Sequence, residues 1–396
     1  MVDGWNYCLL SSVCEEITSG GAAPQGDKYF INGKYPFVRV VDMGNLHGQK
    51  YMLQTRDLLN DVGAEKLRLF PSGTILFTKS GASLLLNQRA ILKVPMYVVS
   101  HIGCLIPNEA IISEWLYYWM KTVDFNIYAH ATTLPSLKLT TIKELRIPVP
   151  TIPEQERIVA RIEELFSQLD AGVETLKKTK AQLAVYRQAV LKEAFSCCAE
   201  KKPIREMSSI VTSGSRGWAK YYCDNGAKFI RIGNLTRNKI YIDLDDIQHV
   251  QLPDKAEGTR TKLAPNDVLV SITADLGSIG LVPNGIGEAY VNQHIAMIRF
   301  NNQMQGEFYA WYLRSEYGQQ DLLRNKRGGG KLGLGLDDIR DSRVPVVSNE
   351  TAESILSIIE CRLSVCDSIE HTVDLALQQA EAMRQSILKD AFEGRL

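Results

Sequence analysis

The nonapeptide RQAVLKEAF at residues 187–195 returns as RQSILKDAF at residues 384–392, and this repetition decides the fold. The two copies lie 197 positions apart in a chain of 396 residues, which is close to half of its length. Similarity at a fixed offset is the signature of a duplicated structural unit. The sequence therefore predicts two tandem copies of one unit.

The same offset holds upstream of the nonapeptide, where LTTIKELRIPVP (139–150) falls on LDDIRDSRVPVV (336–347) without a gap. Earlier matches need small shifts, which loop insertions would produce. They are FVRVVDMGNL (37–46) with FIRIGNL (229–235), LFPSGTILFTKSGAS (69–83) with LAPNDVLVSITADLGS (263–278), and YVVSHIGCLIP (97–107) with YVNQHIAMIRF (290–300). The duplication thus extends over nearly the whole chain.

Each copy has a variable body and a more regular tail. In the bodies, short runs rich in β-branched and aromatic residues, such as YPFVRVV and TILFT, lie between Gly, Pro, Asn and Asp, and one helical pattern follows them. The fold class predicted is α/β (α+β), in two tandem copies separated by long helices. The predicted domains are a first body at 1–150, a central helical region at 151–200, a second body at 201–348 and a C-terminal helical region at 349–396.

The tails predict long helices with a seven-residue repeat. Pro153 suits a first helical turn, and Glu154 and Glu156 suit the positive end of a helix dipole. A heptad of apolar residues indicates a partner helix. The predicted seam residues are Ile162, Leu169, Leu176, Leu183 and Val190 in the first tail, and Ile359, Cys366, Val373, Ala380 and Ile387 in the second. Ile369, Ala376 and Met383 are predicted at the second seam position of the second tail.

A helix of about 42 residues is a rod of roughly 63 Å, far longer than the helix of a typical compact domain. Such a helix needs a partner to bury its apolar stripe, because helical propensity alone rarely stabilises a helix in water. The other tail is the nearest partner. We therefore expect an antiparallel coiled coil with a pseudo-two-fold axis that relates the two copies.

The formal net charge is zero, with 45 Lys and Arg against 45 Asp and Glu, yet the charge is unevenly distributed. The bodies carry +2 and +4, and the tails carry −1 and −5. This is a modest indication that the bodies face an anion. The eight cysteines form no CxxC pair, and no apolar run reaches 18 residues. We therefore expect a cytoplasmic protein with reduced thiols and no metal site.

No catalytic motif is recognisable. RGGGKLGLG at 327–335 lacks the spacing of a phosphate-binding loop, and GxGxxG, HExxH and GxSxG are absent. His101 and His294 occupy matching strands, where lone histidines are more often structural than ligands. Four aromatic residues could stack on bases but at helical spacing are more often core: Tyr117, Trp119, Tyr309 and Trp311.

Over essentially its whole length the chain resembles the specificity subunits of type I restriction-modification enzymes. The resemblance lies in IPVPTIPEQERIVARIE (147–163), the two nonapeptides, the terminal EGRL (393–396), and GTILFTKSG (73–81) with DVLVSITADLGSIG (267–280). It implies two target-recognition domains and an antiparallel coiled coil. It also implies a non-catalytic subunit that binds a bipartite double-stranded DNA site. Two methyltransferase subunits and the restriction subunits would be its partners, and S-adenosylmethionine, ATP and magnesium would be bound by those partners.

Candidate contact residues follow from this reading. For DNA, polar and basic residues in loops after the matched strands are predicted, together with those around the Gly-rich stretch: Thr78, Lys79, Ser80, Thr273, Ser278, Arg324, Lys326, Arg327 and Lys331. Arg39 and Arg231 match between copies, which favours a structural or phosphate role over base reading. For partner subunits the candidates are Tyr186, Arg187, Leu191, Phe195, Arg384, Leu388 and Phe392. The alternative for these helix residues is burial in the intramolecular seam, and the two roles can coexist on different faces of one helix.

Two other function classes are considered. A self-contained methyltransferase-nuclease would need several hundred more residues and the missing motifs. A coiled-coil protein-interaction adaptor with tandem α/β domains would show no salt-dependent affinity for DNA. DNA recognition is the interpretation that the sequence favours.

Overall fold

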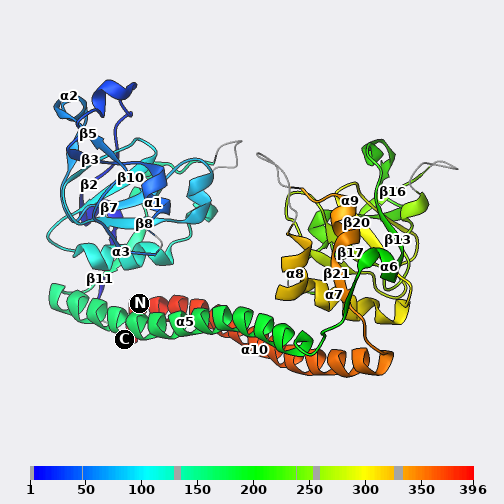
Figure 1. The fold of residues 1–396 in the computed structure, drawn as a ribbon. Helices are drawn as coiled ribbons and strands as arrows, with labels where there is room; N and C mark the ends of the chain where they lie inside the picture. Colours follow the sequence, from blue (N-terminus) through cyan, green and yellow to red (C-terminus); the bar gives the residue numbers. More distant parts are fainter. Residues whose placement is uncertain (1–3, 47, 129–134, 238, 253–258, 325–332) are drawn as a thin grey trace. The chain divides into compact units, whose positions relative to one another are not determined.

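The computed structural model describes residues 4–46, 48–128, 135–237, 239–252, 259–324 and 333–396. The chain forms two compact units: the first comprises Met1–Leu176 and Leu375–Leu396, and the second comprises Lys177–Asp374. Each unit contains one mixed α/β body and about half of each long helix (Figure 1). The predicted fold class, two tandem α/β copies with two long helices, is confirmed.

The first unit contains a five-stranded sheet of order β2-β10-β7-β8-β4, a four-stranded sheet of order β5-β3-β9-β6, and the antiparallel pair β1-β11. Its strands are β1 (Asn6–Leu9), β2 (Cys14–Ser19), β3 (Tyr35–Val38), β4 (Tyr51–Met52), β5 (Asp57–Leu59), β6 (Leu69–Phe70), β7 (Ile75–Thr78), β8 (Arg89–Leu92), β9 (Met96–Val98), β10 (Ile102–Pro107) and β11 (Arg146–Val149). Its α-helices are α1 (Val40–Gly44), α2 (Asp61–Ala64), α3 (Ser113–Thr122) and α4 (Leu139–Lys143), and its 3₁₀ turns are Leu10–Ser12, Asp27–Tyr29, Ala82–Leu86 and Phe125–Tyr128.

The second unit repeats this plan with sheets of order β13-β20-β17-β18 and β14-β16-β15-β19 and the pair β12-β21. Its strands are β12 (Lys201–Pro203), β13 (Ser208–Ser213), β14 (Tyr222–Cys223), β15 (Ala227–Ile230), β16 (Gln248–Val250), β17 (Val268–Ser271), β18 (Ile279–Leu281), β19 (Ala289–Val291), β20 (Ile295–Phe300) and β21 (Arg343–Pro345). Its α-helices are α6 (Ile204–Met207), α7 (Gly306–Arg314), α8 (Glu316–Leu322) and α9 (Leu336–Asp341), and its 3₁₀ turns are Trp218–Tyr221, Ile232–Asn234, Thr259–Thr261 and Gln303–Gln305.

The central strands are buried on both faces, which explains why they read as continuous apolar runs rather than as alternating ones. Every residue of β7 and of β17 is buried. One helix, α3 or α7, lies between the sheets and the long helices of its unit (Figure 1). Tyr117, Trp119 and Tyr309 are buried in these cores, so the prediction that they are core residues is confirmed.

The long helices are α5 (Ile152–Phe195) and α10 (Asn349–Phe392), of 44 residues each. In the second unit Lys180 pairs with Asp374 at 2.7 Å, and Arg187 pairs with Asp367 at 2.6 Å. Residue numbers rise along one helix as they fall along the other, so the helices are antiparallel.

The first unit repeats this antiparallel pairing, with Arg384 on Asp170 and the Arg157 guanidinium on the backbone carbonyl of Leu396. The pairs Arg187–Asp367 and Arg384–Asp170 exchange under the offset of 197 residues. The pseudo-two-fold repeat therefore extends to individual ion pairs.

Each of the ten predicted seam residues is buried or half-buried. The prediction for the second seam position is wrong at Ile369 and Met383, whose side chains are 40% and 55% exposed. Leu363 and Leu388 are buried instead, each in the core of its unit. The reason is that each helix half packs on a body as well as on the other helix, which moves the buried stripe away from a strict heptad.

Candidate nucleic-acid interface

A pair of parallel strands occupies the same place in each unit. In the first unit β3 pairs with β9, placing Val38 opposite Val98, and in the second unit β15 pairs with β19, placing Ile230 opposite Val291. Parallel neighbours end at the same edge of a sheet, and ligands of α/β proteins commonly bind beyond the carboxyl ends of such strands. The residues that follow these strands are therefore candidates for a binding surface.

Six residues, which we call the strand-end residues, lie at or beside this edge. Each unit contributes an arginine after the first parallel strand, a histidine shortly after the second, and a hydroxyl residue after β7 or β17, a strand of the unit's other sheet. They are Arg39, Ser80 and His101 in the first unit and Arg231, Thr273 and His294 in the second.

The backbone of each strand-end arginine is fixed by the residue three positions later. The Arg39 N–H donates to Oδ2 of Asp42 at 2.7 Å, and the Arg231 N–H donates to Oδ1 of Asn234 at 2.8 Å. A short side-chain acceptor at this position satisfies an amide that the following helical turn leaves free. Both arginines thus leave the sheet in the same backbone conformation.

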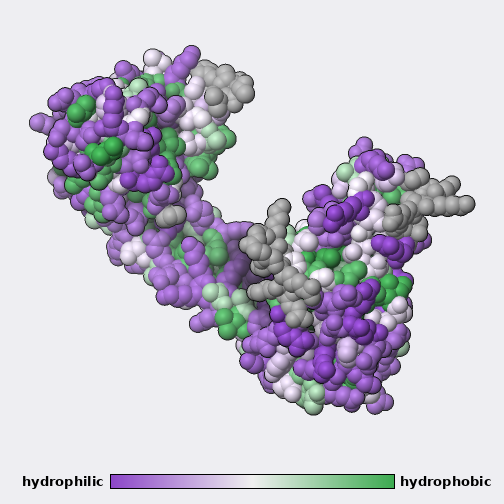
Figure 2. All heavy atoms as spheres, turned by 45° about the horizontal axis from the view of Figure 1, so that its top comes forward, coloured by the Kyte–Doolittle hydropathy of each residue, from purple (hydrophilic) through white to green (hydrophobic). Residues whose placement is uncertain are grey.

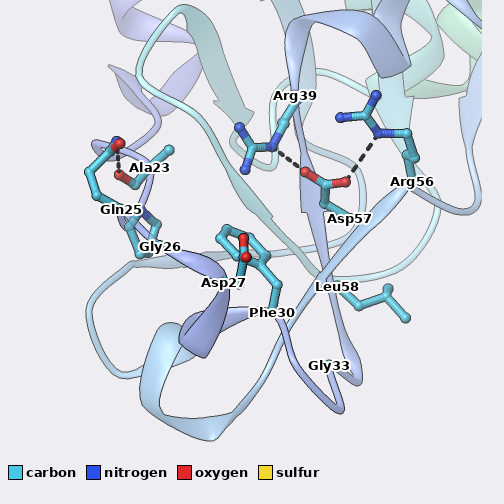
Figure 3. Close-up of a pocket in the computed structure, with 11 residues that line it drawn as sticks. Ala23, Gln25, Gly26, Asp27, Phe30, Gly33, Arg39, Arg56, Asp57 and Leu58 are labelled. Carbon is cyan, nitrogen blue, oxygen red and sulfur yellow. Dashed lines mark hydrogen bonds and ion pairs between the residues drawn. The ribbon is translucent and has the colours of Figure 1, made fainter.

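The Arg39 side chain lines a cavity of about 520 Å³ in the first unit. Its Nε lies 2.5 Å from Oδ2 of Asp57, and its guanidinium carbon lies 5.2 Å from the centre of the Phe30 ring. Asp57 also accepts from Nε of Arg56 at 3.1 Å. Figure 3 shows that the two terminal nitrogens of Arg39 point away from Asp57 and into the cavity. A fork of N–H donors directed into an open cavity suits recognition of an anion.

Arg231 lines the corresponding cavity of the second unit, of about 490 Å³, with Asn292. Its terminal nitrogen lies 3.7 Å from Asp246, whose side chain is fully exposed. An exposed ion pair at this distance contributes little, so Arg231 is held less firmly than Arg39.

The strand-end hydroxyls and histidines form matching pairs. Oγ of Ser80 lies 2.8 Å from Nδ1 of His101, and Oγ1 of Thr273 lies 2.8 Å from Nδ1 of His294. In each pair the residue before the hydroxyl donates its backbone N–H to the histidine carbonyl oxygen, at 3.1 Å in the first unit and 2.9 Å in the second. His101 is exposed, whereas His294 is half-buried with the Gln293 amide 2.8 Å from its Nε2. Sequence matching had aligned these histidines without indicating their hydroxyl partners.

Sequence reasoning missed two glycines that shape this edge. A Cβ on Gly20 would lie 2.1 Å from the carbonyl oxygen of Val98, and one on Gly214 would lie 2.0 Å from that of Val291. Only glycine allows β2 or β13 to continue this close to the end of the parallel strand. The signal was present, because the tripeptide TSG occurs at both 18–20 and 212–214.

Two of the residues predicted to contact DNA are corrected. Thr78 is fully buried and its hydroxyl donates to the carbonyl oxygen of Ser83 at 3.0 Å. Ser278 is 2% exposed and its hydroxyl donates to Oδ2 of Asp275 at 2.6 Å. Hydrogen bonds from Arg237 and Ser278 hold the pKa of Asp275 below its usual range. Hydroxyls buried and satisfied in this way are not available to DNA.

The other predicted DNA residues stay candidates or are not described. Lys79 is half-buried between Thr78 and Ser80, and Arg324 lies 3.6 Å from Asp321 with 61% of its side chain exposed. Lys326, Arg327 and Lys331 lie outside the described residues.

Four of the residues predicted to dock partner subunits are buried in their own units, which is the alternative considered for them, and docking by these helix ends stays a prediction. The Phe392 ring lies 4.6 Å from that of Trp115, and the Phe195 ring lies 5.4 Å from that of Tyr312. Leu191 and Leu388 are each 2% exposed. Arg187 and Arg384 are engaged in the helix ion pairs, and Tyr186 is 49% exposed. Tyr186 is therefore the best remaining candidate of this set.

No cluster of three or more His, Cys, Asp or Glu side chains suited to a metal ion occurs among the described residues. Within that same part of the chain, no helix has the length and apolar character needed to cross a bilayer. Figure 2 shows that the visible surface of each unit is mostly hydrophilic, with small hydrophobic patches.

A family model described as the type I restriction modification DNA specificity domain matches residues 2–184 and again residues 200–379. The chain belongs to this family. The two matches coincide with the two copies of the repeat. Membership of the DNA specificity family agrees with the resemblance seen in the sequence motifs.

Proteins with similar sequences are named as specificity subunits of type I restriction enzymes. The chain is 25% identical over 301 residues to the EcoBI type I restriction enzyme specificity subunit of Escherichia coli, with 68% of this chain and 62% of that protein covered. It is 31% identical to the MjaIX specificity subunit of Methanocaldococcus jannaschii, with 44% and 40% covered. These alignments therefore span less than two thirds of either relative. The StySPI specificity subunit of Salmonella potsdam is 23% identical, with 100% and 89% covered.

Solved structures show the same fold. A structure from work on complex assembly and conformational transition of the type I R-M system matches with a TM-score of 0.78 at 16% identity, covering 100% of this chain and 99% of that one. The HsdS subunit from Thermoanaerobacter tengcongensis matches with a TM-score of 0.55 at 17% identity, covering 100% and 98%. At these identities the likeness concerns the fold.

Proposed function

We propose that the chain is the DNA-recognition subunit of a type I restriction-modification complex. Each unit would read one half of a bipartite, asymmetric double-stranded site, and the helices would set the spacer between the halves. The observation that carries this proposal is the duplicated edge: two units of one DNA specificity family each present an arginine and a histidine after a pair of parallel strands, with a hydroxyl residue beside the histidine. Divergence elsewhere in the bodies would let the half-sites differ.

The subunit would have no catalysis of its own and would act with two methyltransferase subunits and with restriction subunits. S-adenosylmethionine, ATP and magnesium would be bound by those partners, and the complex would work in the cytoplasm on cellular or foreign DNA. Among the residues first considered for docking, exposed Tyr186 on α5 is the one that we retain.

Binding to duplex DNA across a range of salt concentrations separates this function from a protein-interaction adaptor. Each phosphate neutralised should contribute about 0.9 to the slope of log K against log salt, so several contacts give a steep fall. A flat response would support the adaptor instead. Co-expression with the cognate methyltransferase subunit, followed by mapping of methylated sites, should then give both half-sites and the spacer.

A further inference from the structure

The strand-end residues recur in both units although the bodies have diverged. The arginine and histidine are identical between the copies, and serine in one is replaced by threonine, which keeps the hydroxyl. If the units read different half-sites, side chains kept in both are poorly suited to distinguishing bases. What two different half-sites share is the sugar-phosphate backbone, which receives half to two-thirds of protein–DNA hydrogen bonds.

We propose that the strand-end residues provide a sequence-independent phosphate contact in each unit, through the arginine and histidine in the first and through the arginine in the second, and that base reading is done by other residues. This inference rests on the proposed function and assigns one chemical role within it. It concerns the anionic backbone of duplex DNA and no free anion.

The arginine geometry suits this role. Asp57 engages only the Nε side of Arg39, while the terminal nitrogens face the cavity (Figure 3). The side chain is also supported by the rings of Phe30 and Phe37, at 5.2 and 5.3 Å. A guanidinium held at one edge and open at the other is oriented before the phosphate arrives, so less side-chain entropy is lost on binding.

The histidine geometry adds a second donor in the first unit only, because Nε2 of His294 already lies 2.8 Å from the Gln293 amide nitrogen. A hydroxyl that donates to Nδ1 places the ring proton on Nε2, and His101 is exposed. Its Nε2–H would then donate to a phosphate oxygen, with Ser80 as a positioning residue. Substitutions of Arg39 and His101 should therefore change the salt slope by different amounts, because only the arginine carries a fixed charge.

The test uses the full chain with its methyltransferase partner and a duplex carrying the mapped site. Arg39→Gln should weaken binding about tenfold and reduce the salt slope by about 0.9. His101→Ala should weaken binding by a smaller factor and change the slope less than Arg39→Gln does, and His101→Gln, which restores an amide donor, should recover part of the loss. For both positions, discrimination between matched and mismatched half-sites should stay constant.

Arg68→Gln is the matched control, because Arg68 is an exposed arginine of the same unit that pairs with Glu16. It should bind as the unmodified protein does. A scan of single methylphosphonate substitutions in the DNA should locate the contacted phosphate. Substitution of that phosphate should weaken binding by the unmodified protein and leave binding by Arg39→Gln unchanged. Arg231→Gln should become insensitive to methylphosphonate substitution at a different phosphate, in the other half-site.

The outcomes separate the two proposals. If the unmodified protein shows no salt-dependent DNA binding, the proposed function fails. If it binds and Arg39→Gln binds equally well, or if Arg39→Gln changes base discrimination, the phosphate assignment fails and the proposed function stands. Thermal unfolding of each variant shows whether weakened binding is caused by a loss of folding. Arg39→Lys, which keeps the positive charge, should retain the salt slope of the unmodified protein.

Discussion

At the residue scale, the surface formed by the strand-end residues of each unit depends on individual side chains, each of which a single substitution can remove. The strand-end arginines were aligned from sequence, whereas the hydroxyl–imidazole pairs were not, because Ser80 and His101 belong to segments 21 residues apart whose contact follows from strand order. The two edge glycines were missed for the same reason. A glycine in a strand pattern signals close approach of another segment, but the sequence does not say which.

Gly20→Ala should destabilise the first unit by about 1–3 kcal/mol, because its Cβ would overlap the backbone carbonyl of Val98, which cannot move without breaking the sheet. Chemical denaturation measures the change in the free energy of unfolding. Gly172→Ala in α5 is the opposing control: nothing lies within 4 Å of its Cβ position. That change should stabilise by about 0.5–1 kcal/mol, as expected for alanine in a helix interior. Equal effects at the two positions would contradict the close contact.

At the element scale, the strands, the long helices and their antiparallel pairing can be predicted from patterns in the sequence. The heptad repeat predicted the seam but placed Ile369 and Met383 inside it, whereas both are exposed. A linear pattern records that a helix has an apolar face and not which neighbours cover it. Here a helix of the body contributes, through Trp115 on Phe392 in one unit and Tyr312 on Phe195 in the other.

Phe195→Ala and Phe392→Ala should each destabilise their own unit by about 3–5 kcal/mol, because each truncates a buried aromatic ring and leaves a cavity. Hydrogen exchange resolved along the chain should show lost protection mainly in Lys177–Asp374 for the first variant and in the complementary unit for the second. Val185→Ala, at a position 72% exposed on α5, is the control and should change little. If either phenylalanine variant kept its stability and lost only partner binding, the phenylalanine would be a docking residue after all.

Tyr186→Ala tests the retained docking candidate. Because the side chain is 49% exposed, stability should change by less than about 0.5 kcal/mol. Affinity for the methyltransferase subunit, measured by calorimetry, should fall. Unchanged affinity would remove Tyr186 from the interface.

At the scale of the whole molecule, duplication would allow one half of the proposed specificity to change without the other. Each unit has its own hydrophobic cores and its own strand-end residues, and within the described parts of the chain no sheet contains strands of both bodies. Two compact units on one chain can diverge independently. The contacts that tie a body to its helices, by contrast, must be preserved in any exchange.

Replacing residues 1–150 by the equivalent body of a relative should therefore change one half of the methylated motif and leave the other half and the spacer intact. The junction falls just before α5 begins at Ile152, so both long helices are retained. The incoming body must supply an aromatic residue at the position of Trp115, because Phe392 packs there, and a polar atom for Gln155, which accepts from the Ile112 N–H. Exchange of residues 201–348 should alter the opposite half, and methylation mapping reads both results. If both halves of the motif moved in either chimera, the units would not read independently, and specificity would have to be assigned to the helices that both chimeras keep.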